Sequence, residues 1–352
     1  MVLFPFFIAA LISCLLTPVV ALLMTKLKIV DNPRAHERKI HHGLMPLGGG
    51  LAIFLTFFGI VSVGLVSGLL TLPSIPILNL WAVFVGAAVL MIGGWLDDAY
   101  QIRPRYQIIF PLLASAILIG VNFGPEIITN PLGGTINLAH FFSISGTALN
   151  IANLVLFAWL MGMMFTTKFL DGLDGLVAGM TAIAGLVIFF LTQQAAWYQP
   201  DVSFLALLLS GASVGFLIWN WNPAKIFLGE GGSLLAGYLI GVLAVISGSK
   251  IITTLLVMGI PALDVGRVIF ARLKRGHTLS TGDSEHLHFK LIKAGMSQRQ
   301  AVGLYYGVAL VFGLSTLFLS NLFKLIAFAI LVGIFWFIIF TLEKGTVKKS
   351  EK

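Results

Sequence analysis

The chain has 352 residues, of which 58% are hydrophobic and only 10% are charged, and its mean hydropathy is +0.99. In a soluble domain about a quarter of all residues are charged and cover the surface. This composition therefore excludes a soluble globular protein and indicates an integral membrane protein. The net charge of +8 suits anionic lipid and phosphate-bearing ligands. We expect no nucleic-acid partner, because the basic residues border apolar segments and no nucleic-acid motif accompanies them.

Apolar runs long enough to cross a bilayer as helices recur along the whole chain. We therefore predict an all-α polytopic membrane protein of about 11 transmembrane helices, with residues 1–352 forming a single membrane domain. The expected spans are 2–24, 48–70, 79–96, 107–123, 150–167, 175–193, 202–219, 232–247, 251–270, 301–319 and 324–342.

The lysines and arginines predict the orientation. With the N-terminus outside and the C-terminus cytoplasmic, 20 of the 22 basic residues lie inside, leaving only Lys250 and Lys324 outside. The first run lacks a preceding basic residue and is followed by Lys26 and Lys28, so we interpret it as a span rather than a cleaved signal peptide. We expect an active site in the cytoplasmic loops 25–47, 97–106, 168–175, 220–232 and 271–300.

The outer connections are short, apart from the one between the fourth and fifth runs. There Pro125, Pro131 and the pair Gly133-Gly134 punctuate a short apolar stretch. This pattern predicts a small outer hairpin near 125–140.

The third predicted span ends in Asp97-Asp98. Two carboxylates at a membrane boundary repel each other, and a divalent cation or a shared proton would relieve them. A helix end solvated by headgroup water is the plainer interpretation. Arg103 and Arg105 follow closely and could pair with the acids or bind a phosphate.

Asp171 and Asp174 lie three residues apart at the start of the sixth span. On a helix they share a face, and acids at a helix N-terminus are stabilised by the dipole, so either could be only a cap. Gly172 and Gly175 favour a ligand site, because glycine lets the backbone approach a ligand closely.

A glycine-rich turn from Phe227 to Ser233 carries a single acid, Glu230. Ser233 could cap the next helix, and the turn lacks the Gly-Lys-Ser/Thr ending of a Walker loop. One acid is compatible with Mg²⁺, which prefers one or two carboxylates together with phosphate oxygens.

Glu285, His286 and His288 lie in the long loop before the tenth span. Histidines two residues apart do not share a helical face, so a helix-borne zinc pair is not expected. They suit phosphate contact or proton transfer, although loop histidines are often merely solvated. His36, His41 and His42 lie in the basic first loop and are weaker candidates.

Five segments together resemble the polyprenyl-phosphate N-acetylhexosamine-1-phosphate transferases, and they occur in the same order over nearly the full chain. They are Asp31 to Gly49, Leu96 to Arg105, Phe169 to Leu176, Asn222 to Ser233, and Asp283 to His288. Each segment alone is a weak signal, whereas all five on one predicted side are specific.

The resemblance implies a reaction at the cytoplasmic face of the inner (plasma) membrane. A polyprenyl phosphate oxygen attacks the sugar-linked phosphate of a UDP-N-acetylhexosamine and releases UMP. The implied cofactor is Mg²⁺, with Mn²⁺ as a substitute, and the implied lipid is undecaprenyl phosphate. We expect N-acetylglucosamine-1-phosphate as the transferred group and leave open whether the chain forms a homodimer.

The resemblance also assigns roles to individual positions. The expected catalytic residues are Asp97, Asp98, Asp171, His286 and His288. The expected metal ligands are Glu230 and Asp98. The expected substrate-binding residues are Asp174, Asn220, Phe227, Lys168, Lys225, Arg272 and Arg275.

Three positions depart from the family pattern. Glu230 stands where Asp is usual; Phe165 and Lys168 replace two asparagines; and Phe289 replaces a third imidazole. Lys168 could form a salt bridge with Asp171 or contact a phosphate. The histidine loop favours the branch that uses UDP-N-acetylglucosamine for O-antigen, teichoic acid or related polymers over the muramoyl-pentapeptide branch.

Two other classes of function remain as alternatives. An ion-coupled transporter would carry ionisable residues near the span centres, whereas here Asp264 is the main acid within a span. A non-catalytic scaffold would explain the unusual Glu230 and Lys168.

Overall fold

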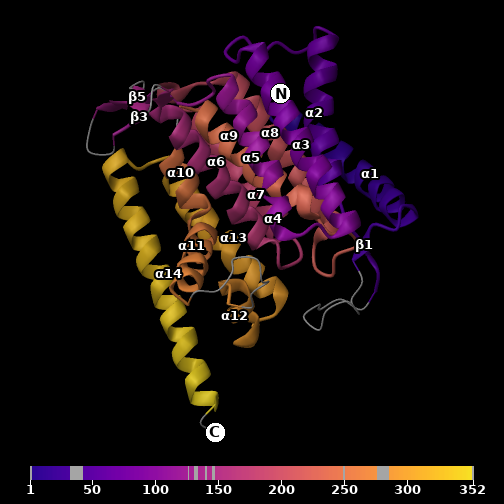
Figure 1. The fold of residues 1–352 in the computed structure, drawn as a ribbon, viewed down its shortest axis with the longest axis vertical. Coiled ribbons are helices and arrows are strands. Elements are labelled where there is room, and N and C mark those ends of the chain that lie inside the picture. Colours follow the sequence, from indigo (N-terminus) through magenta and orange to yellow (C-terminus); the bar gives the residue numbers. More distant parts are fainter. Residues whose placement is uncertain are drawn as a thin grey trace.

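The structure, a computed structural model, describes residues 2–31, 43–125, 127–130, 134–138, 141–144, 147–248, 250–275 and 285–350. It is a helical bundle with three small hairpins (Figure 1). The longer helices are α1 (Phe4–Lys26), α2 (Gly50–Val66), α3 (Ile77–Tyr100), α5 (Ile109–Gly120), α6 (Ile151–Leu170), α7 (Leu176–Thr192), α8 (Pro200–Asn220), α9 (Glu230–Ile246), α11 (Gly259–Arg275), α13 (Gln298–Ser315) and α14 (Asn321–Ser350). The shorter ones are α4 (Pro104–Gln107), η2 (Ala195–Trp197), α10 (Ile251–Val257) and α12 (Leu287–Lys293).

Each of the eleven predicted apolar runs is mainly helical, so the prediction of a mainly helical fold is confirmed. Among the described residues, five helices are long and apolar enough to cross a membrane, namely α1, α3, α6, α8 and α14. A sixth crossing arises if α10 and α11 count as one bent span. Four further apolar helices are shorter, so the number of eleven spans stays a prediction.

The ninth predicted run is not one straight helix. It is split into α10 and α11, which meet at an angle of 84° around Met258. Pro261 lies in the first turn of α11, where its missing N–H needs no intrahelical partner. The local sequence therefore favours a new helix at this point over a continuous one.

The centre of the bundle is formed by α7, α8 and α9, whose residues are nearly all buried. The helices α1 and α14 lie at the periphery instead (Figure 1). On α1, Phe4, Phe7, Leu11 and Leu15 form an exposed apolar stripe at helical spacing. Such a stripe faces lipid in a membrane protein, which fits the composition.

The two ends of the bundle differ. One end carries the hairpins β3–β4 (Ile127–Thr129 with Thr135–Asn137) and β5–β6 (Phe141–Ile144 with Thr147–Asn150). The hairpin predicted near 125–140 is thus confirmed as β3–β4, and the sequence did not predict β5–β6. The other end carries α4, α12 and the hairpin β1–β2 (Val30–Asp31 with Met45–Pro46) (Figure 1).

Candidate active site

Contacts between glycines bring the acidic segments together. A Cβ atom on Gly94 would lie 2.0 Å from the backbone nitrogen of Gly231, and one on Gly50 would lie 2.1 Å from the Cα of Gly232. Only glycine allows backbones to approach this closely. The end of α3 and the start of α2 are therefore packed directly against the first turn of α9, which places Asp97-Asp98 next to Glu230.

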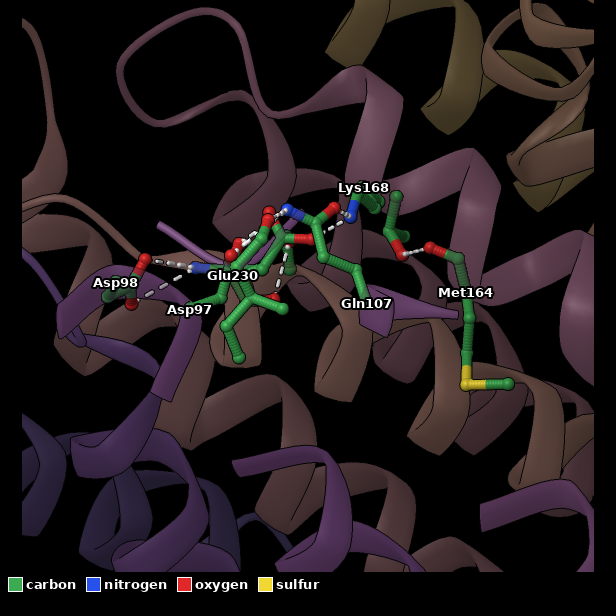
Figure 2. A network of polar contacts seen from close by, with 9 residues as sticks. Asp97, Asp98, Gln107, Met164, Lys168 and Glu230 are labelled. Atoms are coloured by element: carbon green, nitrogen blue, oxygen red, sulfur yellow. Dashed lines mark hydrogen bonds and ion pairs between the residues drawn. The ribbon is translucent and has the colours of Figure 1, made fainter. Parts of the chain in front are cut away.

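A chain of polar contacts joins three of the predicted segments (Figure 2). The side-chain amide of Gln107 donates to both carboxylate oxygens of Asp97 at 3.0 Å, and its oxygen accepts from the ammonium of Lys168 at 2.9 Å. The same ammonium forms an ion pair with the carboxylate of Glu230. Lys168 thus pairs with Glu230 rather than with Asp171, the partner that the sequence suggested.

Asp98 approaches Glu230 from the opposite side. Both its carboxylate oxygens accept from the backbone N–H of Glu230, at 3.2 and 3.3 Å. Gly229 has a φ of +79°, and a Cβ there would lie 2.6 Å from Asp98 Oδ2, so only glycine fits the turn. The geometry holds the Asp98 carboxylate within the glycine-rich turn.

Asp171 adds a further acid to this cluster. Its side chain is exposed, yet desolvation by the surrounding protein raises its pKa to about 8. The charges of Glu230, Asp98 and Asp174 raise this pKa further. Because these carboxylates repel one another, a cation would stabilise the group.

Asp174 lies in the same motif but is engaged by a neighbouring turn. One of its carboxylate oxygens accepts from the side chain of Asn222 at 2.8 Å and from the backbone N–H of Ala224 at 3.1 Å. Arg299 donates to the carbonyl oxygen of Asn222 at 2.7 and 2.9 Å. Asp174 therefore fixes the turn that leads toward Glu230.

Asn220 performs a similar structural task. It is buried, its oxygen accepts from the backbone N–H of Gly175 at 3.0 Å, and its nitrogen donates to the carbonyl of Ile226 at 2.9 Å. Because both ends of its amide are hydrogen-bonded to the backbone, Asn220 in this structure holds the Asp171–Gly175 loop against the turn that contains Ile226. Phe227 and Lys225 lie in the same turn, and the exposed Lys225 ammonium lies 5.0 Å from the ring centroid of Trp219.

His286 is anchored inside the protein. Its Nδ1 lies 2.8 Å from Asp264 Oδ2, which also accepts from the backbone N–H of Leu287 at 2.9 Å. Arg267 pairs with the other oxygen of Asp264 at 2.8 Å and donates to the carbonyl of Glu285. The acid that the sequence marked as unusual within a span thus positions the histidine loop on α11.

His288 differs from His286. Its side chain is 1% exposed, and neither ring nitrogen has a hydrogen-bond partner in the described part of the chain. Burial and the neighbouring His286 lower its pKa to about 4, so the ring is neutral at physiological pH. A Cβ on Gly172 would lie 2.4 Å from His288 Nε2, which places the imidazole against the Asp171 motif.

Aromatic rings hold this loop in place. His286 stacks on His288 with centroids 5.6 Å apart and planes 5° apart, and on Phe169 at 5.9 Å. Phe289, which departs from the family pattern, lies 4.2 Å from His288. The ring at position 289 thus closes the stack by apolar contact.

The two predicted arginines lie on α11. Arg272 is buried, whereas Arg275 is exposed and pairs with Glu285 at 2.6 Å. The predicted candidates His36, His41, His42 and Asp283 lie outside the described residues, so the structure says nothing of them.

The donor set fits a hard divalent cation. Within the described ranges, no three His, Cys, Asp or Glu side chains form a preassembled metal cluster. Mg²⁺ does not need one, because it usually takes one or two carboxylates and completes its shell with water and substrate phosphates. Asp98, which accepts from the backbone N–H of Glu230, and Glu230 itself are the residues that would hold it.

The sequence did not predict three residues of the site, namely Gln107, Asn222 and Arg299. Gln107 lies at the start of an apolar run, and no spacing pattern linked it to Asp97 or Lys168. Asn222 lies within a recognised motif, but only the fold shows that it binds Asp174.

Comparisons with known proteins identify relatives of this chain. The model of a family described as glycosyl transferase family 4 matches residues 80–248. The chain is 29% identical over 322 residues to a probable undecaprenyl-phosphate N-acetylglucosaminyl 1-phosphate transferase of Bacillus subtilis, covering 90% of this chain and 84% of the relative.

Two further relatives extend the likeness. A decaprenyl-phosphate N-acetylglucosaminephosphotransferase of Mycobacterium tuberculosis is 30% identical, with 85% of this chain and 77% of the relative covered. A phospho-N-acetylmuramoyl-pentapeptide-transferase of Halalkalibacterium halodurans is 28% identical, with 88% and 94% covered.

Proposed function

The chain belongs to glycosyl transferase family 4, and from this premise we propose that it transfers N-acetylglucosamine-1-phosphate from UDP-N-acetylglucosamine to a polyprenyl phosphate. A phosphate oxygen of the lipid attacks the sugar-linked phosphorus, the bond from that phosphorus to the bridging oxygen breaks, and UMP leaves with the electron pair. Two relatives, named as transferases that act on undecaprenyl phosphate and decaprenyl phosphate, support this reaction class.

One observation carries the proposal. Acids from α3, from the start of α9 and from the loop after α6 lie at one end of the bundle beside Lys168. Phosphoryl transfer depends on alignment and charge neutralisation more than on covalent help from the protein. A cluster of carboxylates that also contains the Lys168 ammonium suits that task.

We assign the metal to Asp98 and Glu230. When bound there, Mg²⁺ would neutralise charge on the diphosphate of the donor. Lys168, now paired with Glu230, would then be free to contact a phosphate oxygen. Asp97 and Gln107 keep that ammonium within the site.

One groove of the structure would suit the proposed lipid substrate. A space of about 780 Å³ lies between α11 and α14, with Leu263, Phe270 and Trp336 among its apolar walls. Arg267, Lys274 and Arg275 also line it, and Arg275 reaches the loop that carries His286. We assign the prenyl chain to this groove and its phosphate to the basic residues.

The unpartnered His288 is the remaining candidate for proton transfer or phosphate contact. A neutral imidazole with a free nitrogen can accept a proton or a hydrogen bond. Its place against Gly172 puts it beside Asp171, which we assign to the sugar-phosphate side of the site.

We place this end of the bundle at the cytoplasmic face of the plasma membrane, where UDP-sugars are available, and treat the enzyme as a first membrane step of cell-envelope glycan synthesis. The test is a panel of UDP-sugars with polyprenyl phosphate, reading out UMP. Release with UDP-N-acetylglucosamine in Mg²⁺ supports the assignment. Absence of release with every UDP-N-acetylhexosamine would overturn it.

A further inference from the structure

Two lysines lie at the end of the bundle opposite to the candidate active site. Lys250 directly precedes α10, and Lys324 lies in the first turn of α14. Each residue is only 7% exposed. The start of α14 lies at the end that carries β3 and β5 (Figure 1). Both lysines therefore lie at the end of the bundle away from the catalytic cluster.

Neither ammonium has a hydrogen-bond or ion-pair partner among the residues that the structure describes. The Lys250 ammonium lies 3.1 Å from the ring centroid of Trp197. Asp201, in the first turn of α8 just after this tryptophan, accepts instead from the backbone N–H of Ser74 at 2.8 Å. Within the described residues, the two positive charges are thus left without a carboxylate partner.

The pair is electrostatically unfavourable in this state. Burial lowers the pKa of Lys250 to about 8, and the charge of Lys324 lowers it further. Lys324 also lies at the positive end of the α14 dipole, where cations are disfavoured and anions favoured. Two like charges that are largely buried from water destabilise the fold unless an anion offsets them.

We propose that Lys250 and Lys324 bind a phosphate-bearing anion, supplied either by the headgroup of an anionic phospholipid or by free phosphate. Lysine ammoniums bind phosphate as point charges. The Trp197 ring, 40% exposed beside Lys250, is of the type that lies at headgroup depth in membrane proteins. This site is independent of the transferase reaction.

The first test measures lipid binding to the purified full-length protein by native mass spectrometry, with phosphatidylglycerol or phosphatidylcholine added. We expect retained phosphatidylglycerol on the wild type, and weaker binding by about tenfold for each lysine replaced in Lys250→Met and Lys324→Met. Lys344→Met is the matched control, because Lys344 lies on the same helix, 4.3 Å from the Phe340 ring. Equal phosphatidylglycerol binding by all variants, with no response to phosphate, overturns the proposal.

The second test separates the two sources and guards against unfolded variants. Inorganic phosphate is added to the wild type and to the double variant. If it raises the melting temperature of the wild type only, and phosphatidylglycerol is not retained, free phosphate is the ligand. Without any anion, Lys250→Met should melt higher than the wild type because one repelling charge is gone. A lower melting temperature would show that Lys250 serves only to pack on Trp197, contrary to the proposal.

Discussion

The ammonium of Lys168, near the end of α6, forms an ion pair with the carboxylate of Glu230, the first residue of α9. Both positions depart from the pattern of the family that the chain resembles, and the fold shows that the two departures are in contact. Glu230 is one methylene longer than the usual Asp, and its carboxylate pairs with the added positive charge of Lys168. The two changes therefore compensate each other in charge. This coupling favours a working site over a degenerate scaffold.

The ion pair predicts competition with the metal. Lys168→Met removes the cation that occupies Glu230, so the dissociation constant for Mn²⁺ should fall about tenfold, the value of one charge-assisted contact. Mn²⁺ binding followed by electron paramagnetic resonance measures this directly, with Lys344→Met as the control. Unchanged or weaker Mn²⁺ binding would mean that Glu230 does not hold the metal.

Asp171 predicts a pH dependence of stability in the metal-free protein. Its folded pKa of about 8 lies above the ordinary value of 3.8, so the folded state binds more protons between these values. The free energy of unfolding should therefore fall as pH rises through this window. Thermal unfolding in a chelator between pH 5 and 8 should show a shallower pH dependence for Asp171→Asn than for the wild type. Identical slopes would contradict the assigned pKa.

The two histidines should differ in what their replacement costs. His288→Asn should abolish UMP release and lower the free energy of unfolding less than His286→Asn does, because the His288 ring has stacking contacts but no hydrogen bond within the described part of the chain. His286→Asn breaks the contact with buried Asp264 and should cost about 2–5 kcal/mol of stability. Thermal unfolding of both variants checks the contrast. A strong loss of stability in His288→Asn would show that its ring is structural.

Gly94 should tolerate no side chain. Gly94→Ala places a methyl group against the backbone of Gly231, which should cost about 1–3 kcal/mol or more and separate Asp98 from Glu230. Gly162→Ala on α6 meets open space and should be neutral or slightly stabilising. Melting temperature and Mn²⁺ binding report the two effects, and equal behaviour of the variants would argue against the glycine contact.

The sequence predicted the helical architecture because long apolar runs are a local signal. It also predicted that Asp97-Asp98, Asp171 and Glu230 belong together, since charge placement put their loops on one side. The sequence did not predict the bend at Met258. Gly259 and Pro261 favour it locally, but it also depends on packing between α11 and α14, which a single sequence does not show. A Cβ on Gly259 would lie 2.2 Å from the Leu331 side chain of α14.

Residue roles within the motifs were harder to predict. Sequence reasoning treated Asp174 and Asn220 as substrate contacts, whereas in this structure their side chains fix Asn222, Gly175 and Ile226. Whether Asp174 also meets a nucleotide stays a prediction. The bonds from Asp174 to Asn222 and from Asn220 to Gly175 join residues 48 and 45 positions apart, and no periodicity in a single sequence reveals them.

The most direct test of the account is UMP release from UDP-N-acetylglucosamine and undecaprenyl phosphate, titrated with Mg²⁺ in the wild type and in Glu230→Gln. We predict Mg²⁺-dependent release by the wild type and a loss of at least about a hundredfold in Glu230→Gln, since one metal-binding charge disappears. Equal release by both proteins, at every Mg²⁺ concentration, would contradict it.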